Sequence, residues 1–203
     1  MQNERELVRK IKAGDPRAFE TLVSDYESKI YALALRFTGS PQDALDICQE
    51  VFLRIFRFVG NFNEDSKLST WIYRIATNVC KDTLNRRARN QDIPLDREED
   101  GEVFDLGLAD SRYSPEEALL SAEIQDSIVS AILALPELYR EIIILRDING
   151  LTYDEIAAAL ELEVGTVKSR IARARERLRG MLSRDGNLLP STRSNHLKGG
   201  ERL

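Results

Sequence analysis

The sequence has few of the residues on which most enzymes rely. Its 203 residues include only two cysteines and one histidine, His196, which lies in a polar stretch near the end of the chain. These residues do not have the spacing of a metal site, and no glycine-rich segment resembles a phosphate-binding loop. No nucleophile and base form a recognisable pair. We therefore predict that the protein is not an enzyme, and we expect no catalytic residue, no metal and no cofactor.

Long apolar runs are also absent. The first residues, MQNERELVRK, lack the apolar core of a signal peptide, and no segment of the sequence is long enough to span a membrane. Cys48 and Cys80 each fall on the apolar arc of a predicted helix, which is typical of buried thiols in a reducing compartment. These features predict a cytoplasmic protein without membrane insertion.

No segment alternates convincingly between polar and apolar residues, whereas helical periodicity occurs in both halves of the chain. The periodicity and turn signals predict helices at about residues 5–13, 16–39, 40–60, 68–89 and 138–148, followed by one from Thr152 and one from Val164. A short loop at 61–67 precedes the fourth helix. The predicted fold class is all-α, with two small helical domains.

The charges are unevenly distributed along a chain whose net charge is −5. Residues 92–126 carry twelve acidic side chains against two arginines, whereas residues 165–184 carry seven cations against one glutamate. A negative net charge argues against a nucleic-acid partner, but this asymmetry is more informative than the total. We expect a flexible acidic linker in the middle of the chain and a disordered polar tail at 185–203.

The segment from Thr152 to Arg179 reads as two helices joined by a short turn. Thr152 and Glu155 form a capping-box pattern at the start of the first helix. An apolar stripe predicts the buried face of the second helix: Val164, Val167, Ile171, Ala174 and Leu178. The opposite face carries small side chains flanked by cations, which suits base edges lying between two phosphate backbones. A lone basic helix is more often a solvated surface, but the preceding helix favours a helix-turn-helix that enters a DNA major groove.

The predicted helix at 68–89 has a polar arc of another kind. This arc combines hydroxyl, aromatic, amide and cationic side chains: Thr70, Tyr73, Arg74, Thr77, Asn78, Lys81 and Asn85. Such side chains suit single-stranded nucleic acid, because bases stack on rings and phosphates pair with cations. Trp71 lies at the edge of the apolar arc, where a core residue is more usual than a stacking platform.

One leucine interrupts the polar face of the predicted helix at 40–60. Leu53 lies among charged side chains that include Asp46, Glu50 and Arg54. A single exposed leucine is common and needs no functional explanation. A leucine ringed by charges is also typical of the centre of a small protein-docking patch. The spacing alone leaves both interpretations open.

Three strings together resemble a bacterial sigma factor of the sigma-70 family, and within it the extracytoplasmic-function (ECF) group. They are DALDICQEVFLRIFRF, STWIYRIATNVCKDTLNRRAR and LTYDEIAAALELEVGTVKSRIARARERLR, and the likeness extends over about residues 4–183. The resemblance implies a sigma-2 helical bundle at 1–91 and a sigma-4 helix-turn-helix domain at 122–184. The acidic segment 92–121 would be the flexible linker between them, with the tail at 185–203.

The family resemblance implies that the protein binds core RNA polymerase, directs it to promoters and assists promoter opening. The implied residues that bind core RNA polymerase are Asp46, Gln49, Glu50, Leu53 and Arg54. Those implied for the −10 element and its non-template strand are Ser66, Lys67, Ser69, Tyr73, Arg74, Asn78 and Lys81. Those implied for the −35 duplex are Thr166, Lys168, Ser169, Arg170, Arg173 and Arg175. An anti-sigma protein, often anchored in the membrane, is a further implied partner and would hold the chain at the inner membrane face.

Two other classes of protein fit parts of the pattern. A stand-alone helix-turn-helix regulator would bind DNA tightly without RNA polymerase. The second class is an interaction protein that sequesters a partner. In that case, replacing cations of the last predicted helix, such as Lys168 and Arg173, by alanine would not change promoter output.

Overall fold

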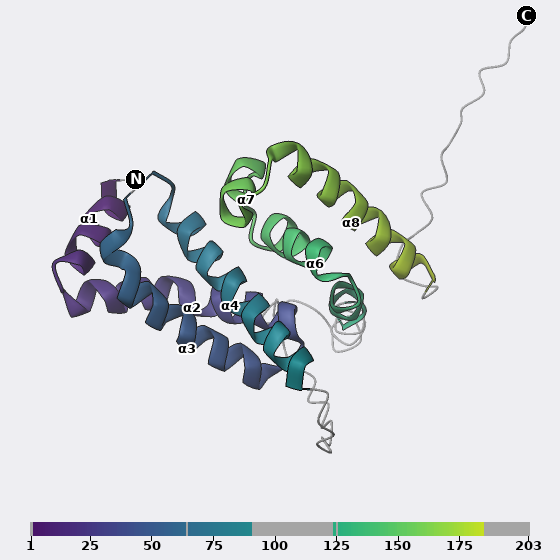
Figure 1. The fold of residues 1–203 in the computed structure, drawn as a ribbon, viewed down its shortest axis with the longest axis horizontal. Coiled ribbons are helices and arrows are strands. Elements are labelled where there is room, and N and C mark those ends of the chain that lie inside the picture. The colour runs from purple at the N-terminus through teal and green to yellow at the C-terminus, as the bar shows by residue number, and fades with distance from the viewer. Residues whose placement is uncertain (1, 64, 91–123, 125, 185–203) are drawn as a thin grey trace, which may run out of the picture.

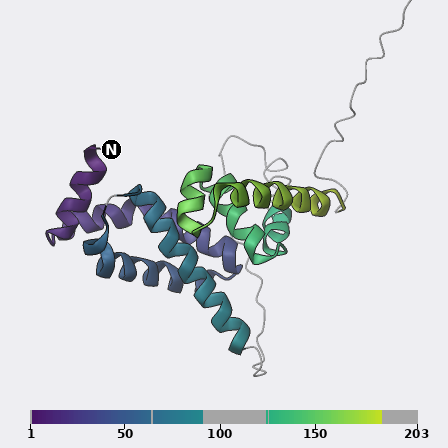
Figure 2. The ribbon, with the colours of Figure 1, turned by 45° about the horizontal axis from the view of Figure 1, so that its top comes forward.

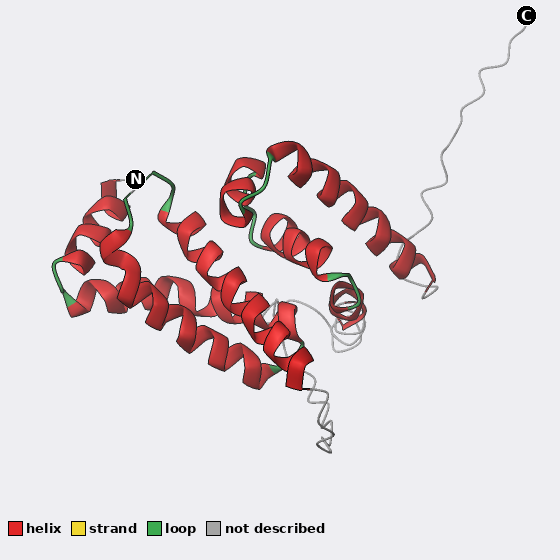
Figure 3. Cartoon of the chain, viewed as in Figure 1, coloured by secondary structure: helices red, strands yellow, loops and turns green. Residues whose placement is uncertain are grey.

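The computed structural model describes residues 2–63, 65–90, 124 and 126–184. Within these ranges every regular element is helical and there is no strand (Figure 3). The predicted linker at 92–121 and the predicted tail at 185–203, with His196, lie outside the described residues. None of the described helices is both long and apolar enough to cross a membrane.

The helices form two units (Figure 1). The N-terminal bundle consists of α1 (Gln2–Lys12), α2 (Pro16–Thr38), α3 (Pro41–Phe58), the 3-10 turn η1 (Val59–Asn61) and α4 (Leu68–Asn90). The C-terminal unit consists of a helical segment at 126–133, α6 (Glu137–Ile143), the π-helical turn η2 (Ile144–Ile148), α7 (Tyr153–Leu160) and α8 (Val164–Arg184). The predicted all-α fold with two helical units is confirmed.

Local capping sets several helix boundaries where the sequence predicts them. The Asp15 side chain accepts a hydrogen bond from the Arg17 N–H at 2.9 Å, and Pro16 occupies the first turn of α2. α2 ends at Gly39, which has a positive φ of 68°. At the start of α7, the Thr152 hydroxyl accepts from the Glu155 N–H at 3.2 Å, and Glu155 accepts from the Thr152 N–H at 2.8 Å. These bonds satisfy N–H groups that have no partner within their own helix.

The helix predicted at 138–148 is not uniform. α6 gives way to the π-helical turn η2, in which the Asn149 N–H donates to the carbonyl oxygen of Ile144, five residues earlier. A π turn has a wider ring than an α-helical turn, and simple periodicity does not predict it. It brings Asn149 to the side of the C-terminal unit that faces α4, as its hydrogen bond to Tyr73 shows.

The buried side chains of the two units form one continuous cluster. In the N-terminal bundle, α2, α3 and α4 enclose Leu22, Ile30, Leu33, Phe37, Ile47, Ile55 and Ile72. In the C-terminal unit, α6, η2 and α8 enclose Ile142, Ile143, Ile144, Val167, Ile171 and Ala174. Figures 1 and 2 both show α7 against α4, and the two helices are in contact. The units are therefore packed together, with α4 at their boundary.

Candidate nucleic-acid interface

The outer face of α8 remains open to solvent. The predicted apolar stripe is buried at Val167, Ile171 and Ala174, so the opposite face carries the cations. Lys168, Ser169 and Arg173 are exposed, and Thr166 is half-buried. The Ser169 hydroxyl donates to the backbone oxygen of Thr166 at 2.9 Å. Four residues predicted for the −35 duplex thus lie together on one helix.

Arg175 and Arg170 differ from these four because each pairs with a carboxylate. Arg175 makes a two-pronged contact with Asp147 of η2, in which Nε lies 3.1 Å from Oδ2. Hydrogen bonding to Asp147 raises the pKa of Arg175. Arg170 is half-buried and faces Glu141 at 3.7 Å. A DNA contact by either arginine requires exchange of a carboxylate for a phosphate.

The polar arc of α4 is more buried than the sequence predicts. Tyr73 is 5% exposed and Thr77 is fully buried, because the C-terminal unit covers this arc. The Asn149 amide donates to the Tyr73 hydroxyl at 3.1 Å, and burial raises the pKa of Tyr73. Of the other residues of this arc, Asn78 and Asn85 are exposed, and Arg74 and Lys81 are half-buried. A helical wheel counts these side chains as outward-facing, but it cannot include a second unit packed against them.

Glu141 joins the two predicted DNA-binding surfaces. Its side chain is only 4% exposed and lies 2.5 Å from Lys81 of α4 and 3.7 Å from Arg170 of α8. Burial raises the pKa of this carboxyl group, an effect that the Lys81 ammonium partly offsets. One buried carboxylate therefore pairs with a cation predicted for the −10 region and with another predicted for the −35 duplex.

Two more cations of the N-terminal bundle also face the C-terminal unit. Lys67 pairs with Glu155 at 2.7 Å, and this contact lowers the pKa of Glu155. Arg74 faces the exposed Glu161 at 3.9 Å, a weaker contact. Carboxylates of the C-terminal unit thus compensate the charges of both cations in the packed arrangement.

A cavity lies at the start of α4. Its volume is about 330 Å³, at the lower end of the range of about 300–1,000 Å³ found for small-ligand pockets. It is lined by Asn61, Phe62, Asn63, Asp65, Ser66, Thr70, Trp71, Arg74 and, from α7, Ala158. Of the residues predicted for the −10 element, only Ser66 and Arg74 line it. The family resemblance also implies that the loop at 61–69 reads the −10 element, but it singles out no residue among Asn61, Phe62, Asn63 and Asp65, because a loop has no periodicity. Asn61 and Asn63 are side chains suited to hydrogen bonding with a base.

Two aromatic rings form one wall of this cavity. The ring centroids of Phe62 and Trp71 are 5.2 Å apart, with an angle of 42° between the rings. Trp71 is 8% exposed, which agrees with its interpretation as mainly a core residue. Its ring nevertheless contributes to the cavity lining. The cavity therefore combines an aromatic wall with amide, carboxylate, hydroxyl and guanidinium groups.

The outer face of α3 carries more apolar surface than Leu53 alone. Leu53 is 50% exposed, and Leu45 and Phe56 are 50% and 64% exposed. Phe56 contacts Phe19 of α2 edge-on, with ring centroids 5.3 Å apart. Of the predicted polar residues, Asp46 and Gln49 are exposed, and Glu50 bonds to Arg54 at 2.7 Å. Sequence reasoning missed Leu45 and Phe56, which a helical wheel at about 100° per residue places beside Gln49.

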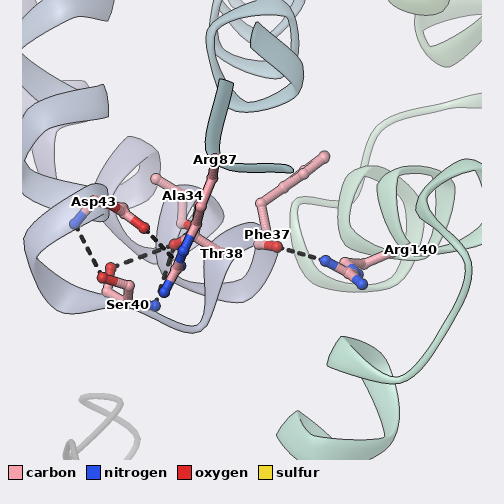
Figure 4. A network of polar contacts seen from close by, with 7 residues as sticks. All are labelled: Ala34, Phe37, Thr38, Ser40, Asp43, Arg87 and Arg140. Atoms are coloured by element: carbon pink, nitrogen blue, oxygen red, sulfur yellow. Dashed lines mark hydrogen bonds and ion pairs between the residues drawn. The ribbon is translucent and has the colours of Figure 1, made fainter. Parts of the chain in front are cut away.

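Arg140 is the polar link between the units at the far end of α2 (Figure 4). Its guanidinium donates to the carbonyl oxygen of Phe37 at 2.6 Å and to those of Leu133 and Leu135 at 2.6 and 3.0 Å. The Phe37 carbonyl lies in the last turn of α2, where the helix leaves acceptors free. A single side chain thereby ties the end of α2 to the segment that precedes α6.

Both units match models of known families. The model for Sigma-70 region 2 matches residues 22–90, and the model for Sigma-70, region 4 matches residues 125–178. The chain is 42% identical over 177 residues to the RNA polymerase sigma-H factor of Pseudomonas aeruginosa, covering 86% of this chain and 91% of that protein. It is 40% identical over 182 residues to the ECF RNA polymerase sigma factor SigW of Bacillus subtilis, covering 88% and 96%.

A solved structure has a similar arrangement. It is that of CnrH in complex with the cytosolic domain of CnrY, with a TM-score of 0.65, 26% sequence identity and coverage of 90% of this chain and 98% of that chain.

A helical protein with a region 2 bundle and a region 4 helix-turn-helix unit is a transcription initiation factor. More specifically, the chain belongs to the ECF sigma factors of the sigma-70 family. It is a non-enzymatic subunit that binds core RNA polymerase, directs it to promoters and assists promoter opening.

Proposed function

We propose that three surfaces of the chain divide the work of initiation. The open face of α8 binds the −35 duplex, the start of α4 with its cavity binds the −10 element, and the outer face of α3 binds core RNA polymerase. In functional terms the chain would then divide into a region 2 domain at 1–91, a connecting segment at 92–121 and a region 4 domain at 122–184. The observation that carries the proposal is the cavity, whose lining belongs to the N-terminal bundle, apart from Ala158 of α7, and suits one unstacked base.

Extruding a base from a duplex costs a few kcal/mol, which a fitted pocket can offset by stacking and hydrogen bonding. The Phe62 and Trp71 rings supply an aromatic wall, while Asn61 and Asn63 supply amide groups for the edge of the base. Lys67 and Lys81 would then compensate phosphates of the same strand, together with Ser69, Tyr73 and Asn78. Promoter opening in this scheme is driven by binding energy alone.

The packed arrangement of the two units is, in our proposal, a closed state of the free chain. Tyr73 and Lys81 of the N-terminal bundle cannot contact DNA while Asn149 and Glu141 of the C-terminal unit occupy them. The units must separate before both surfaces bind one promoter. Core RNA polymerase would hold the separated units at the spacing of the two elements, so that each contact raises the effective concentration of the other.

An anti-sigma protein is a further proposed partner, and the cytoplasm is the proposed location. The support is the family itself and the fold shared with CnrH, whose solved structure contains the cytosolic domain of a second protein, CnrY. If the partner is anchored in the membrane, the chain would be held at the inner membrane face. Cell fractionation tests this: the chain should enter the membrane fraction only when the partner gene is intact.

The α3 surface can be tested with two matched substitutions. Leu53→Asp places a charge within the proposed surface and should weaken binding to core RNA polymerase at least about tenfold, as expected for a central apolar contact. Phe58→Asp makes an equivalent change at an exposed phenylalanine about 140° around the same helix and should have little effect. Equal losses of polymerase affinity in the two variants would contradict the assignment of this α3 surface to polymerase binding.

A further inference from the structure

α1 lies outside the residues matched by the region 2 model, yet it holds the segment that bears the cavity. The Lys12 ammonium donates to the backbone oxygen of Phe62 at 2.5 Å. The Leu68 N–H donates to the Glu4 carboxylate, also at 2.5 Å. Phe62 directly follows η1, and Leu68 is the first residue of α4. One helix thus contacts both ends of the segment between η1 and α4.

The two contacts come from one face of α1. Glu4 and Lys12 are eight residues apart, or about 12 Å along a helix, and therefore lie near one another around its axis. Val8 and Ile11 lie on the same side and are 1% and 6% exposed. Their burial fixes α1 on the bundle. The distance between the two anchors is therefore set by a packed helix rather than by the segment that they hold.

Electrostatics favour both contacts. The Leu68 N–H has no partner within α4, because the first N–H groups of a helix lack one. The Glu4 carboxylate satisfies it from another helix and also complements the positive end of the α4 dipole. Lys12 ends α1, where a cation complements the negative end of that helix. Charge-assisted hydrogen bonds of this kind are stronger than neutral ones.

Each anchor leads directly to the cavity. Lys12 holds the backbone of Phe62, whose ring forms the aromatic wall with Trp71. Glu4 holds the first residue of α4, and Thr70 and Arg74 line the cavity from the first two turns of that helix. A loss of either anchor would free one side of the cavity relative to the other.

We propose that Glu4 and Lys12 are positioning residues for the −10 base. They touch no DNA themselves; they set the width of the cavity and therefore its preference among bases. The proposal rests on the proposed function of the cavity. It predicts that changes in α1 alter the choice of base more than they alter the overall strength of promoter binding.

The test uses holoenzyme assembled from the full chain and core RNA polymerase. A pool of promoter fragments first identifies a promoter by run-off transcription. Fluorescent fork-junction DNAs of that promoter then carry each of the four bases, or an abasic site, at each single-stranded −10 position. The preference is the ratio of dissociation constants between the abasic and the best DNA at the most sensitive position. The same DNAs report affinity for the unchanged −35 duplex.

Glu4→Ala and Lys12→Met should each reduce this preference about fivefold to tenfold, the factor that one hydrogen bond contributes. Glu4→Gln retains an acceptor oxygen and Lys12→Arg retains a donor, so these variants should keep most of the preference. Glu6→Ala and Lys10→Met are the controls, because Glu6 and Lys10 pair with each other at 2.9 Å on the exposed side of α1. They should leave the preference unchanged.

Three results would overturn the inference. A uniform loss of affinity for all DNAs, with the preference unchanged, would mean that α1 only stabilises the bundle. Equal effects in the control variants would mean the same. If the wild-type holoenzyme prefers no base over an abasic site, the cavity does not have its proposed function. Glu4 and Lys12 then cannot act as positioning residues for a base. Thermal unfolding of the conservative variants distinguishes altered preference from lost folding.

Discussion

Replacing Lys81 by methionine should open the closed state. The substitution keeps the length of the side chain but leaves the buried Glu141 carboxylate with only the more distant Arg170, at 3.7 Å, as its cationic partner. Breaking a fully buried ion pair costs about 3–5 kcal/mol, whereas an exposed pair contributes at most about 1 kcal/mol. The Glu141 side chain is 4% exposed, but those of Lys81 and Arg170 are 30% and 28% exposed. We therefore expect an intermediate loss of about 1–2 kcal/mol, which shifts the equilibrium between closed and open states about 5–30-fold.

The opening can be measured as a distance. Spin labels at Lys29→Cys in α2 and Arg179→Cys in α8 report the separation of the two units, since both positions are exposed. Lys81→Met should increase the population of long distances.

The matched control is Arg86→Met, which removes the same charge at an exposed position of α4. Arg86 lies outside the ion pairs of Glu141, so the distance distribution should stay as in the wild type. If Lys81→Met and Arg86→Met give the same distance distribution, the ion pair between Lys81 and Glu141 does not hold the units together and the reasoning is refuted.

Three further outcomes are expected. Gly39→Ala should lower the free energy of unfolding by about 1–2 kcal/mol or more in chemical denaturation, because φ is positive there and an added Cβ would lie 3.1 Å from Leu133. Gly14→Ala shares the positive φ but meets no atom within 4 Å, so a loss at Gly39 no larger than that at Gly14 would contradict the contact between the units. Thr152→Ala should reduce the free energy of unfolding by about 1 kcal/mol through loss of the α7 cap, and an unchanged melting temperature would argue against the capping box. Cys48 and Cys80 should react with iodoacetamide at pH 8 only after denaturation, because both thiols are buried and burial raises the pKa of Cys48 to about 11. Rapid reaction of the native chain would contradict this prediction, because it would show that the thiols are accessible.

Features set by neighbours in the chain were predictable from the sequence. Asp15-Pro16 and Gly39 mark the two ends of α2, and Thr152 with Glu155 marks the start of α7. Each of these signals acts within a few residues, through a side-chain hydrogen bond or a restricted φ. The apolar stripe of α8 was also predictable, because its periodicity lies within one helix. Val167 and Ile171 of this stripe are buried, as predicted.

Features set by contacts between distant residues were not predictable in this way. Tyr73 and Asn149 are 76 positions apart, and no periodicity in α4 indicates that a second unit covers its polar arc. The cavity depends on the path of a short segment between η1 and α4, for which the sequence carries no repeating pattern. Glu141 did leave a signal: a carboxylate followed directly by the apolar run IIIL is expected to need a buried cationic partner. The identity of that partner still required the fold.

DNA binding with and without core RNA polymerase tests the central claim most directly. A fork-junction promoter DNA, titrated with the chain alone, with core RNA polymerase alone and with both together, gives three dissociation constants at one salt concentration. The closed arrangement covers Tyr73 and Lys81, so tight binding and base preference should appear only when both proteins are present. Equally tight and selective binding by the chain alone would contradict the account, because it would show that the promoter-binding surfaces are accessible without separation on RNA polymerase.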